Sequence, residues 1–318
     1  MGDLCFPQLL NVSCRIRKIS QSRTAQIYLF SLFSVLSVSL NLLVIISLHT
    51  PTNLLLLSLA VSDFLHGLVV LPLQTHDFGD CWLLGDLICS LYYIATSLFT
   101  NASIGDMILI SVDRYMAICD PLYYRSRVTV TRVKMWICVC WCFCLLYSGV
   151  GYRDDLAQPG RFKSCEGQCY IYYGNTEMTV DIVLTFIAPI TLIIILYMRV
   201  FVVAVSQARS MRSHVGAVTL QHSGTIRTKK SELKAARTLG VVVLVFLICF
   251  CSYYILLFIF LQNIPSYLIM LITSCLVYIN PCLNPLIYAL FYPWFRKSIR
   301  LILSLQILQP GSRETNML

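Results

Sequence analysis

A few acidic and amide side chains interrupt the long apolar stretches of this chain. Asp63 lies within the apolar segment NLLLLSLAVSDF, and Asn284-Pro285 lies within another, NPLIY. Three more polar residues of this kind are Asn41, Ser103 and Asn280. Polar groups in such surroundings are costly and usually functional, so these residues could form a buried cluster around a small hydrated cation such as sodium. A purely structural hydrogen-bond network would use the same groups, and the sequence leaves both interpretations open.

An acidic and a basic residue stand side by side at the end of the third apolar stretch, in the string Asp113-Arg114-Tyr115. Glu232 stands at the beginning of the sixth stretch and could form an ion pair with Arg114. Breaking such a pair would separate two helices and give a two-state element, whereas the alternative is an ordinary solvated surface pair. Two tyrosines are candidates to contact Arg114 once the pair opens: Tyr197 and Tyr288.

No set of residues has the spacing of a catalytic or metal-binding centre. The five histidines are scattered along the chain: His49, His66, His76, His214 and His222. A light-driven pump or photopigment would need a lysine in the seventh apolar stretch to hold retinal, and residues 265–290 contain none. A transporter would usually show internal repeats or broken helices, and neither is evident. We therefore expect neither an enzyme nor a bound cofactor, the sodium ion excepted.

The elements that must position these residues are membrane-spanning helices. The chain has 318 residues, of which 58% are hydrophobic and only 12% charged, about half the charge that a soluble domain carries. A bilayer core about 30 Å thick needs about 20 apolar residues per helix. Runs of that length recur at residues 25–48, 52–74, 87–119, 131–151, 178–207, 233–261 and 265–290. The sequence therefore predicts an all-α membrane protein, a bundle of seven transmembrane helices.

Three segments follow from this pattern. Residues 1–24 are polar and form an N-terminal segment without a cleavable signal peptide, so the first helix is expected to act as the targeting signal. Residues 25–290 form the seven-transmembrane domain. Residues 291–318 begin with FYPWFRKSIRLILS, which places apolar and basic residues on opposite helical faces. This predicts a short amphipathic eighth helix at the membrane surface, followed by a short cytoplasmic tail.

The basic residues set the orientation. If the N-terminus lies outside, 17 of the 24 Lys and Arg residues fall in the cytoplasmic segments 114–134 and 199–237 and in the tail. Cytoplasmic loops carry an excess of basic residues, so an extracellular N-terminus is expected. Because the charge is confined to loops beside the membrane, lipid and not nucleic acid is the expected partner. This orientation makes Asn11-Val12-Ser13 a usable glycosylation site.

Six cysteines lie on the oxidising side in this orientation and can form disulfides: Cys5, Cys14, Cys81, Cys89, Cys165 and Cys169. Six cysteines allow 15 pairings, and spacing alone does not choose between them.

The order and spacing of several motifs resemble those of rhodopsin-like G-protein-coupled receptors. The residues that carry this resemblance are Asn41, Asp63, Cys89, Asp113-Arg114-Tyr115, Trp141, Pro189, Phe246 and NPLIY at 284–288. A finer resemblance, to the trace amine-associated receptors, is carried by HTPTN at 49–53, CWLLGDLIC at 81–89, DRYMAICDPLYY at 113–124, KAARTLGVVV at 234–243 and FYPWFRK at 291–297. It implies a plasma-membrane receptor for small, odorant amines. The expected partner is a heterotrimeric G protein of the stimulatory kind that raises cyclic AMP.

The resemblance also implies three disulfides. Cys89 is expected to pair with Cys169 and hold the second extracellular loop over the pocket. Two further bridges would tie down the N-terminus, and the resemblance favours Cys5–Cys165 and Cys14–Cys81.

The expected ligand site departs from the usual aminergic pattern. Most aminergic receptors carry an Asp 18 residues before the arginine of the DRY string, and this chain has Thr96 there. Asp181 lies eight residues before Pro189, and a branch of the family prominent in fish has an Asp at this fifth-helix position instead. The resemblance therefore implies Asp181 as the counter-ion of the ligand ammonium. The other expected lining residues are Thr96, Tyr92, Thr100, Phe250, Tyr253, Tyr254 and Tyr278.

Two alternatives stay open because of these departures. The sixth helix reads Phe250-Cys251-Ser252 where the family pattern has Trp-x-Pro, and Asn280-Pro281 replaces the usual Asn-Ser. A receptor of the same fold for a monoamine transmitter would fit the chain, as would one for a non-amine small molecule or a peptide.

Overall fold

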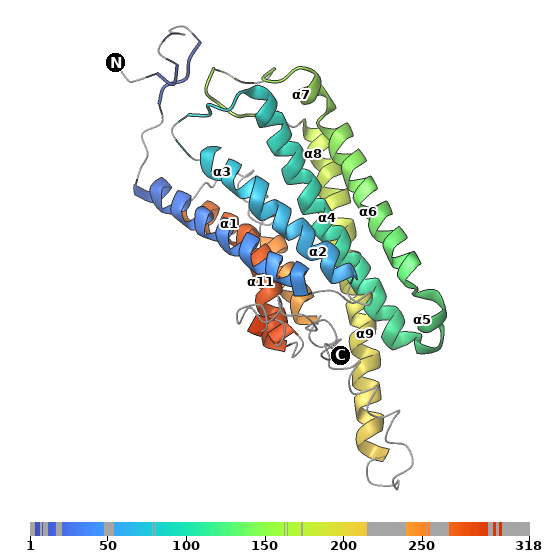
Figure 1. The fold of residues 1–318 in the computed structure, drawn as a ribbon. Helices are drawn as coiled ribbons and strands as arrows, with labels where there is room; N and C mark the ends of the chain where they lie inside the picture. Colours follow the sequence, from blue (N-terminus) through green and yellow to red (C-terminus); the bar gives the residue numbers. More distant parts are fainter. Residues whose placement is uncertain are drawn as a thin grey trace, which may run out of the picture.

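Long helices that run side by side make up most of the computed structural model (Figure 1). The structure describes residues 4–6, 8, 12–16, 21–47, 54–77, 79, 81–161, 163, 165–172, 174–214, 240–252, 254, 267–291, 295–296 and 299–300. In this part of the chain, six helices are long and apolar enough to cross a membrane. They span Arg23–Ser47, Leu54–Asp77, Asp86–Cys119, Val130–Gly151, Thr176–Ser206 and Leu271–Ala289.

The predicted sixth span, 233–261, is described only as the shorter apolar helix Gly240–Ser252. The other predicted spans agree with the structure to within a few residues at most ends. The first and last are α1 (Gln21–Ser47) and α11 (Tyr267–Phe291), and the third and fourth are α4 (Asp86–Cys119) and α6 (Val130–Gly151). Two short helices, α5 (Pro121–Arg127) and α7 (Arg153–Ala157), adjoin the two ends of α6.

The second and fifth spans each contain a wide π-helical turn next to a proline. In the second span the turn His66–Val70 joins α2 (Leu54–Leu65) to α3 (Leu71–Asp77), which contains Pro72. In the fifth, the turn Ile182–Ile187 joins α8 (Asn175–Asp181) to α9 (Ala188–His214), which contains Pro189. Proline has no N–H to donate to the preceding turn, and π-helical turns often mark functional sites. Asp181 therefore sits directly before a local widening of its helix.

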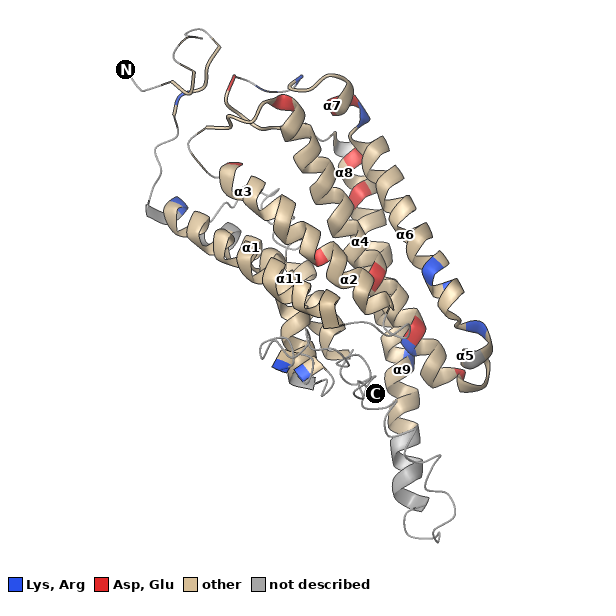
Figure 2. Ribbon diagram, in the orientation of Figure 1, with Lys and Arg blue, Asp and Glu red and all other residues tan. Residues whose placement is uncertain are grey.

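The α4 helix holds the bundle together, because it packs against α2, α6 and α9. The hydrophobic core joins residues from most of the spans, and its completely or almost completely buried members include Leu59, Met107, Ile193, Phe246 and Tyr288. The outward faces are apolar as well, with Val139, Phe143 and Leu146 more than 60% exposed on α6. An apolar exterior of this kind belongs in lipid, and Figure 2 shows that most of the helical length carries neither acidic nor basic residues.

Two regions extend beyond the predicted spans. The α9 helix continues to His214, seven residues past its predicted end, and its last segment QARSMRSH is polar and projects beyond the neighbouring helices (Figure 1). After α11, Phe295 is buried and its ring lies edge-on to Tyr288 at 6.3 Å, whereas Arg296 and Arg300 are exposed. This contrast between faces is what an amphipathic eighth helix requires.

Three disulfides fasten the extracellular side. Cys89 pairs with Cys169, as predicted. The two N-terminal pairings were predicted wrongly: Cys5 bonds Cys81 instead of Cys165, and Cys14 bonds Cys165 instead of Cys81.

Backbone hydrogen bonds explain the N-terminal pairing. The amide of Cys14 donates to the carbonyl of Glu166, and the amide of Glu166 donates to Val12, which places Cys14 beside Cys165. On the other side of the same loop, the amide of Trp82 donates to Gly167. A Cβ on Gly167 would lie only 2.8 Å from the Cys5 Cβ. Because glycine has no side chain, Gly167 leaves room for Cys5 to reach Cys81. Asn11, the predicted glycosylation site, lies outside the described residues.

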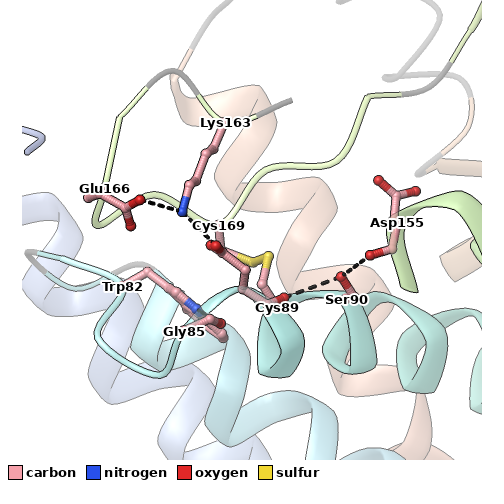
Figure 3. A network of polar contacts seen from close by, with 9 residues as sticks. Trp82, Gly85, Cys89, Ser90, Asp155, Lys163, Glu166 and Cys169 are labelled. Carbon is pink, nitrogen blue, oxygen red and sulfur yellow. Dashed lines mark hydrogen bonds and ion pairs between the residues drawn. A yellow bond between two sulfur atoms is a disulfide. The ribbon is translucent and has the colours of Figure 1, made fainter. Parts of the chain in front are cut away.

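A lysine ties the second extracellular loop to the top of α4 (Figure 3). Lys163 Nζ lies 2.5 Å from Asp86 Oδ2 and 2.8 Å from Glu166 Oε1. Burial disfavours the ammonium, but its hydrogen bonds to Asp86 and Glu166 outweigh this and raise the pKa of Lys163. The Ser90 hydroxyl donates to the backbone carbonyl of Asp155 at 2.9 Å. The loop is therefore held over the helix ends by charge as well as by the Cys89–Cys169 disulfide.

Candidate ligand-binding and signalling sites

Asp181 is the half-buried last residue of α8. The hydroxyl of Tyr147, on α6, donates a 2.7 Å hydrogen bond to Asp181 Oδ1. The hydroxyl of Thr185 donates to the Asp181 backbone carbonyl at 2.8 Å. Asp181 Oδ2 accepts no hydrogen bond from the described residues, so one carboxylate oxygen is oriented by the fourth span and the other is available to a ligand.

Aromatic residues adjoin this carboxylate. The Thr185 hydroxyl lies 3.2 Å from the Tyr254 hydroxyl, and the Tyr254 ring stacks on Phe186 with centroids 4.1 Å apart. Phe250 is buried one turn away and stacks on Phe246 at 4.5 Å. Of the predicted lining residues, Tyr254 is therefore connected to Asp181 through Thr185, while Tyr253 lies outside the described residues.

Tyr92 and Tyr278 meet at a different residue, Gln74. Tyr278 donates to Gln74 Oε1 at 2.8 Å, and Tyr92 donates to the same oxygen. Gln74 was missed by the sequence reasoning, although an amide within the second apolar run is the kind of polar residue that marks a site in a membrane. Two separate groups therefore form: Tyr92 and Tyr278 around Gln74, called here the Gln74 group, and Tyr254 with Thr185 beside Asp181.

Thr96, at the position where most aminergic receptors carry an Asp, forms its hydrogen bond within its own helix. The Thr96 hydroxyl donates to the backbone carbonyl of Tyr92 at 2.8 Å, within α4. Thr100 is half-buried one turn further along the same helix. Neither side chain has the charge to hold an ammonium, so Asp181 carries the only negative charge among the predicted ligand-binding residues.

The residues of the DRY string, at the other end of α4, form an ion pair and hydrogen bonds with one another and with α5. The Arg114 guanidinium pairs with its neighbour Asp113, and the Tyr124 hydroxyl donates to Asp113 Oδ1 at 2.9 Å. Tyr124 belongs to α5 and was missed by the sequence reasoning. Tyr115 packs against Ile118 and Val200. The predicted partner Glu232 lies outside the described residues.

The two tyrosines expected to contact Arg114 belong to other helices: Tyr197 to α9 and Tyr288 to α11. A Cβ on Gly240 would lie 3.7 Å from the Tyr197 ring, so Tyr197 faces the start of the described part of the sixth span. Tyr288 is buried in the core. Its helix, α11, contains Pro281 and Pro285. Movement of the sixth span would therefore change the surroundings of Tyr197 first.

The predicted polar cluster is centred on Asp63. Asn284 donates to Asp63 Oδ2 at 2.8 Å, and Ser103 donates to Asp63 Oδ1 at 3.4 Å. Asn280 is buried, and the side-chain oxygens of Asn280 and Asn284 find no hydrogen-bond partner among the described residues. Asn41 donates to the backbone carbonyl of Pro281 at 3.0 Å and so ties α1 to α11. A carboxylate in contact with Asn284, whose amide oxygen has no hydrogen-bond partner among the described residues, fits a hard cation, which prefers oxygen ligands.

Comparison with known proteins defines the class. A family model described as 7 transmembrane receptor (rhodopsin family) matches residues 35–288. The chain is 37% identical to Trace amine-associated receptor 8a of Rattus norvegicus, over 98% of this chain and 95% of the relative. It is 36% identical to Trace amine-associated receptor 6 of Pan troglodytes over 99% and 95%, and 35% identical to Trace amine-associated receptor 13c of Danio rerio over 99% and 96%. The chain belongs to the rhodopsin family of seven-transmembrane receptors and, within it, to the trace amine-associated receptors.

Membership settles several expectations. The protein is a signalling receptor and not an enzyme, and it crosses the plasma membrane several times with its N-terminus outside. The seven-helix bundle is confirmed, with the family model extending across the part of the sixth span that lies outside the described residues. The family also implies amine sensing coupled to a G protein.

Proposed function

We propose that this receptor detects small odorant amines and that Asp181 is the counter-ion of the ligand ammonium. The observation that carries the proposal is the hydrogen bond from Tyr147 to Asp181 Oδ1, which orients a half-buried carboxylate and leaves its second oxygen accessible. An ammonium that leaves water loses several kcal/mol of hydration and needs a compensating charge. Thr96, bonded to its own helix, offers none.

Aromatic rings complete the cation site. Tyr254 and Phe186 stack on each other beside Thr185, whose hydroxyl bonds to both Tyr254 and the Asp181 backbone. A cation over such a ring gains about 0.5–2 kcal/mol. The amine would therefore lie against the fifth span, on the opposite side from Thr96.

Signalling would pass to Arg114. When the ligand draws the fifth and sixth spans together at the extracellular side, the inner ends of the third and sixth spans separate. Arg114 then leaves Asp113 and contacts the C-terminus of a stimulatory G protein, and cyclic AMP rises. The basic third intracellular loop, with Arg227, Lys229 and Lys230, flanks this opening; it lies outside the described residues.

The test is a ligand panel with cyclic AMP as the readout. Cells expressing the full chain are exposed to primary, secondary and tertiary alkylamines, to alcohols and hydrocarbons of the same shapes, and to catecholamines and short peptides. The proposal predicts that amines raise cyclic AMP and that their neutral isosteres do not. Equal responses to an amine and its alcohol would contradict an ionic site, and a response confined to peptides or catecholamines would assign the receptor to another ligand class.

A further inference from the structure

A groove of about 240 Å³ runs between α4, α6 and the fifth span. Its apolar walls are formed by Ile104 and Ile108 of α4, Phe143 of α6 and Leu184 of the fifth span. At Gly105 the α4 helix approaches α6 closely, because a Cβ there would lie 2.3 Å from Cys140 Sγ. The volume is just below the roughly 300–1,000 Å³ of sites for drug-sized ligands, which suits a ligand of few heavy atoms.

The groove opens toward the bilayer. Phe143 and Leu184 at its rim are 64% and 50% exposed, and both belong to helices that span the membrane. Exposed apolar side chains at that depth face hydrocarbon. A molecule dissolved in the lipid therefore reaches the groove without crossing the extracellular loop.

Asp181 stands at one end of the groove. Two of the lining residues, Tyr147 and Thr185, make the hydrogen bonds to Asp181. The lining residues include no charged side chain, so the groove combines an apolar channel with a single carboxylate beside its extracellular end. An occupant matching this charge distribution has one cationic head and an apolar chain.

We propose that the groove binds the alkyl chain of a lipophilic primary amine, whose ammonium is held by Asp181 and which enters sideways from the bilayer. This inference rests on the proposed function and narrows its ligand class to amines with an apolar chain of several carbons. The chain lies between α4 and α6, outside the centre of the bundle, and the Gln74 group takes no part in holding it.

The experiment compares n-alkylamines from ethylamine to octylamine in wild type and in Leu184→Trp, with cyclic AMP as the readout. Burial of each added methylene should improve potency roughly fourfold in wild type until the groove is full. Leu184→Trp fills the groove, so hexylamine and octylamine should lose at least tenfold in potency while ethylamine is unchanged. Ile195→Trp is the matched control: Ile195 is 53% exposed on the same span but does not line the groove. It also controls for accumulation of long amines in the membrane.

A second variant keeps the groove testable if Leu184→Trp fails to fold. Phe143→Ala removes a rim side chain and should move the optimum to a longer amine by at least one carbon. Wild-type responses to octylamine in both groove variants, with Asp181→Asn unresponsive, would overturn the groove site and leave the proposed function standing. A wild-type response in Asp181→Asn would overturn both.

Discussion

The hydroxyl of Tyr147 donates a 2.7 Å hydrogen bond to Asp181 Oδ1 and so connects the fourth membrane span to the fifth. The carboxylate is thereby fixed in direction before any ligand arrives. Preorganisation of this kind lowers the ordering cost of binding, which matters for a ligand with few atoms.

Replacement of Tyr147 by Phe tests this orientation. The variant keeps the ring, which stacks on Phe143 at 6.3 Å, and removes only the hydroxyl. A hydrogen bond to a charged group contributes about 1.5–3 kcal/mol, so amine potency should fall by about ten- to a hundredfold. Concentration–response curves at equal surface expression measure it. An increase in potency would mean that the hydroxyl competes with the ligand for the carboxylate instead of orienting it.

We propose that the Asp113–Arg114 pair holds the receptor in its resting state. Asp113→Asn neutralises the partner of Arg114 and should raise ligand-independent cyclic AMP by up to about fivefold, because a partly exposed ion pair contributes up to about 1 kcal/mol. Tyr124→Phe, which removes only the hydrogen bond to Asp113, should give a smaller rise. Arg114→Ala should abolish cyclic AMP production; if ligand-driven cyclic AMP persisted in that variant, the arginine would not be the coupling group.

Disulfide mapping checks the extracellular side. Proteolysis of the unreduced receptor should release one peptide pair linking Cys5 to Cys81 and another linking Cys14 to Cys165. Mass spectrometry before and after reduction identifies the pairs. Peptides linking Cys5 to Cys165 would contradict the register set by the hydrogen bonds between Cys14 and Glu166.

Sodium distinguishes the two interpretations of the polar cluster. If the oxygens around Asp63 hold the ion, replacing sodium with a bulky organic cation should change amine potency in wild type and leave Asp63→Asn unchanged. Ser111→Ala, which removes a buried hydrogen bond to the Met107 carbonyl within α4 and leaves the carboxylate and the amide side chains, is the control and should keep the sodium response. A wild-type receptor indifferent to sodium would make the cluster a structural network.

Hydrophobic run length predicted the spans well because a bilayer sets the length of every helix that crosses it. The cluster at Asp63, Ser103 and Asn284 was predictable for a related reason: a polar side chain within an apolar helix must meet another one, and the candidates are few. Polarity alone thus identified residues that lie far apart in the sequence and meet in the core.

The choice of partner was harder to predict because it depends on how each helix is rotated. The polarity of Gln74 within an apolar run gave a signal but not its partner, and Tyr147 is one tyrosine among many; they bond Tyr278 and Asp181 because of the way their helices are rotated. The N-terminal disulfides depend on a few backbone hydrogen bonds around Glu166 and Gly167, which leave no hydropathy signal. Tyr124 reaches Asp113 from a loop helix whose position no periodicity fixes.

The amine response of Asp181→Asn tests the central claim most directly. Asparagine keeps the size of the side chain and can still accept the Tyr147 hydrogen bond, but it has no charge. Loss of one member of a buried charge pair costs about 3–5 kcal/mol, so the half-maximal amine concentration should rise roughly a hundredfold or more. Glu177→Gln, at an exposed acid on the same helix, should respond as wild type does. An unchanged amine response in Asp181→Asn at normal surface expression would contradict the assignment of Asp181 as the counter-ion.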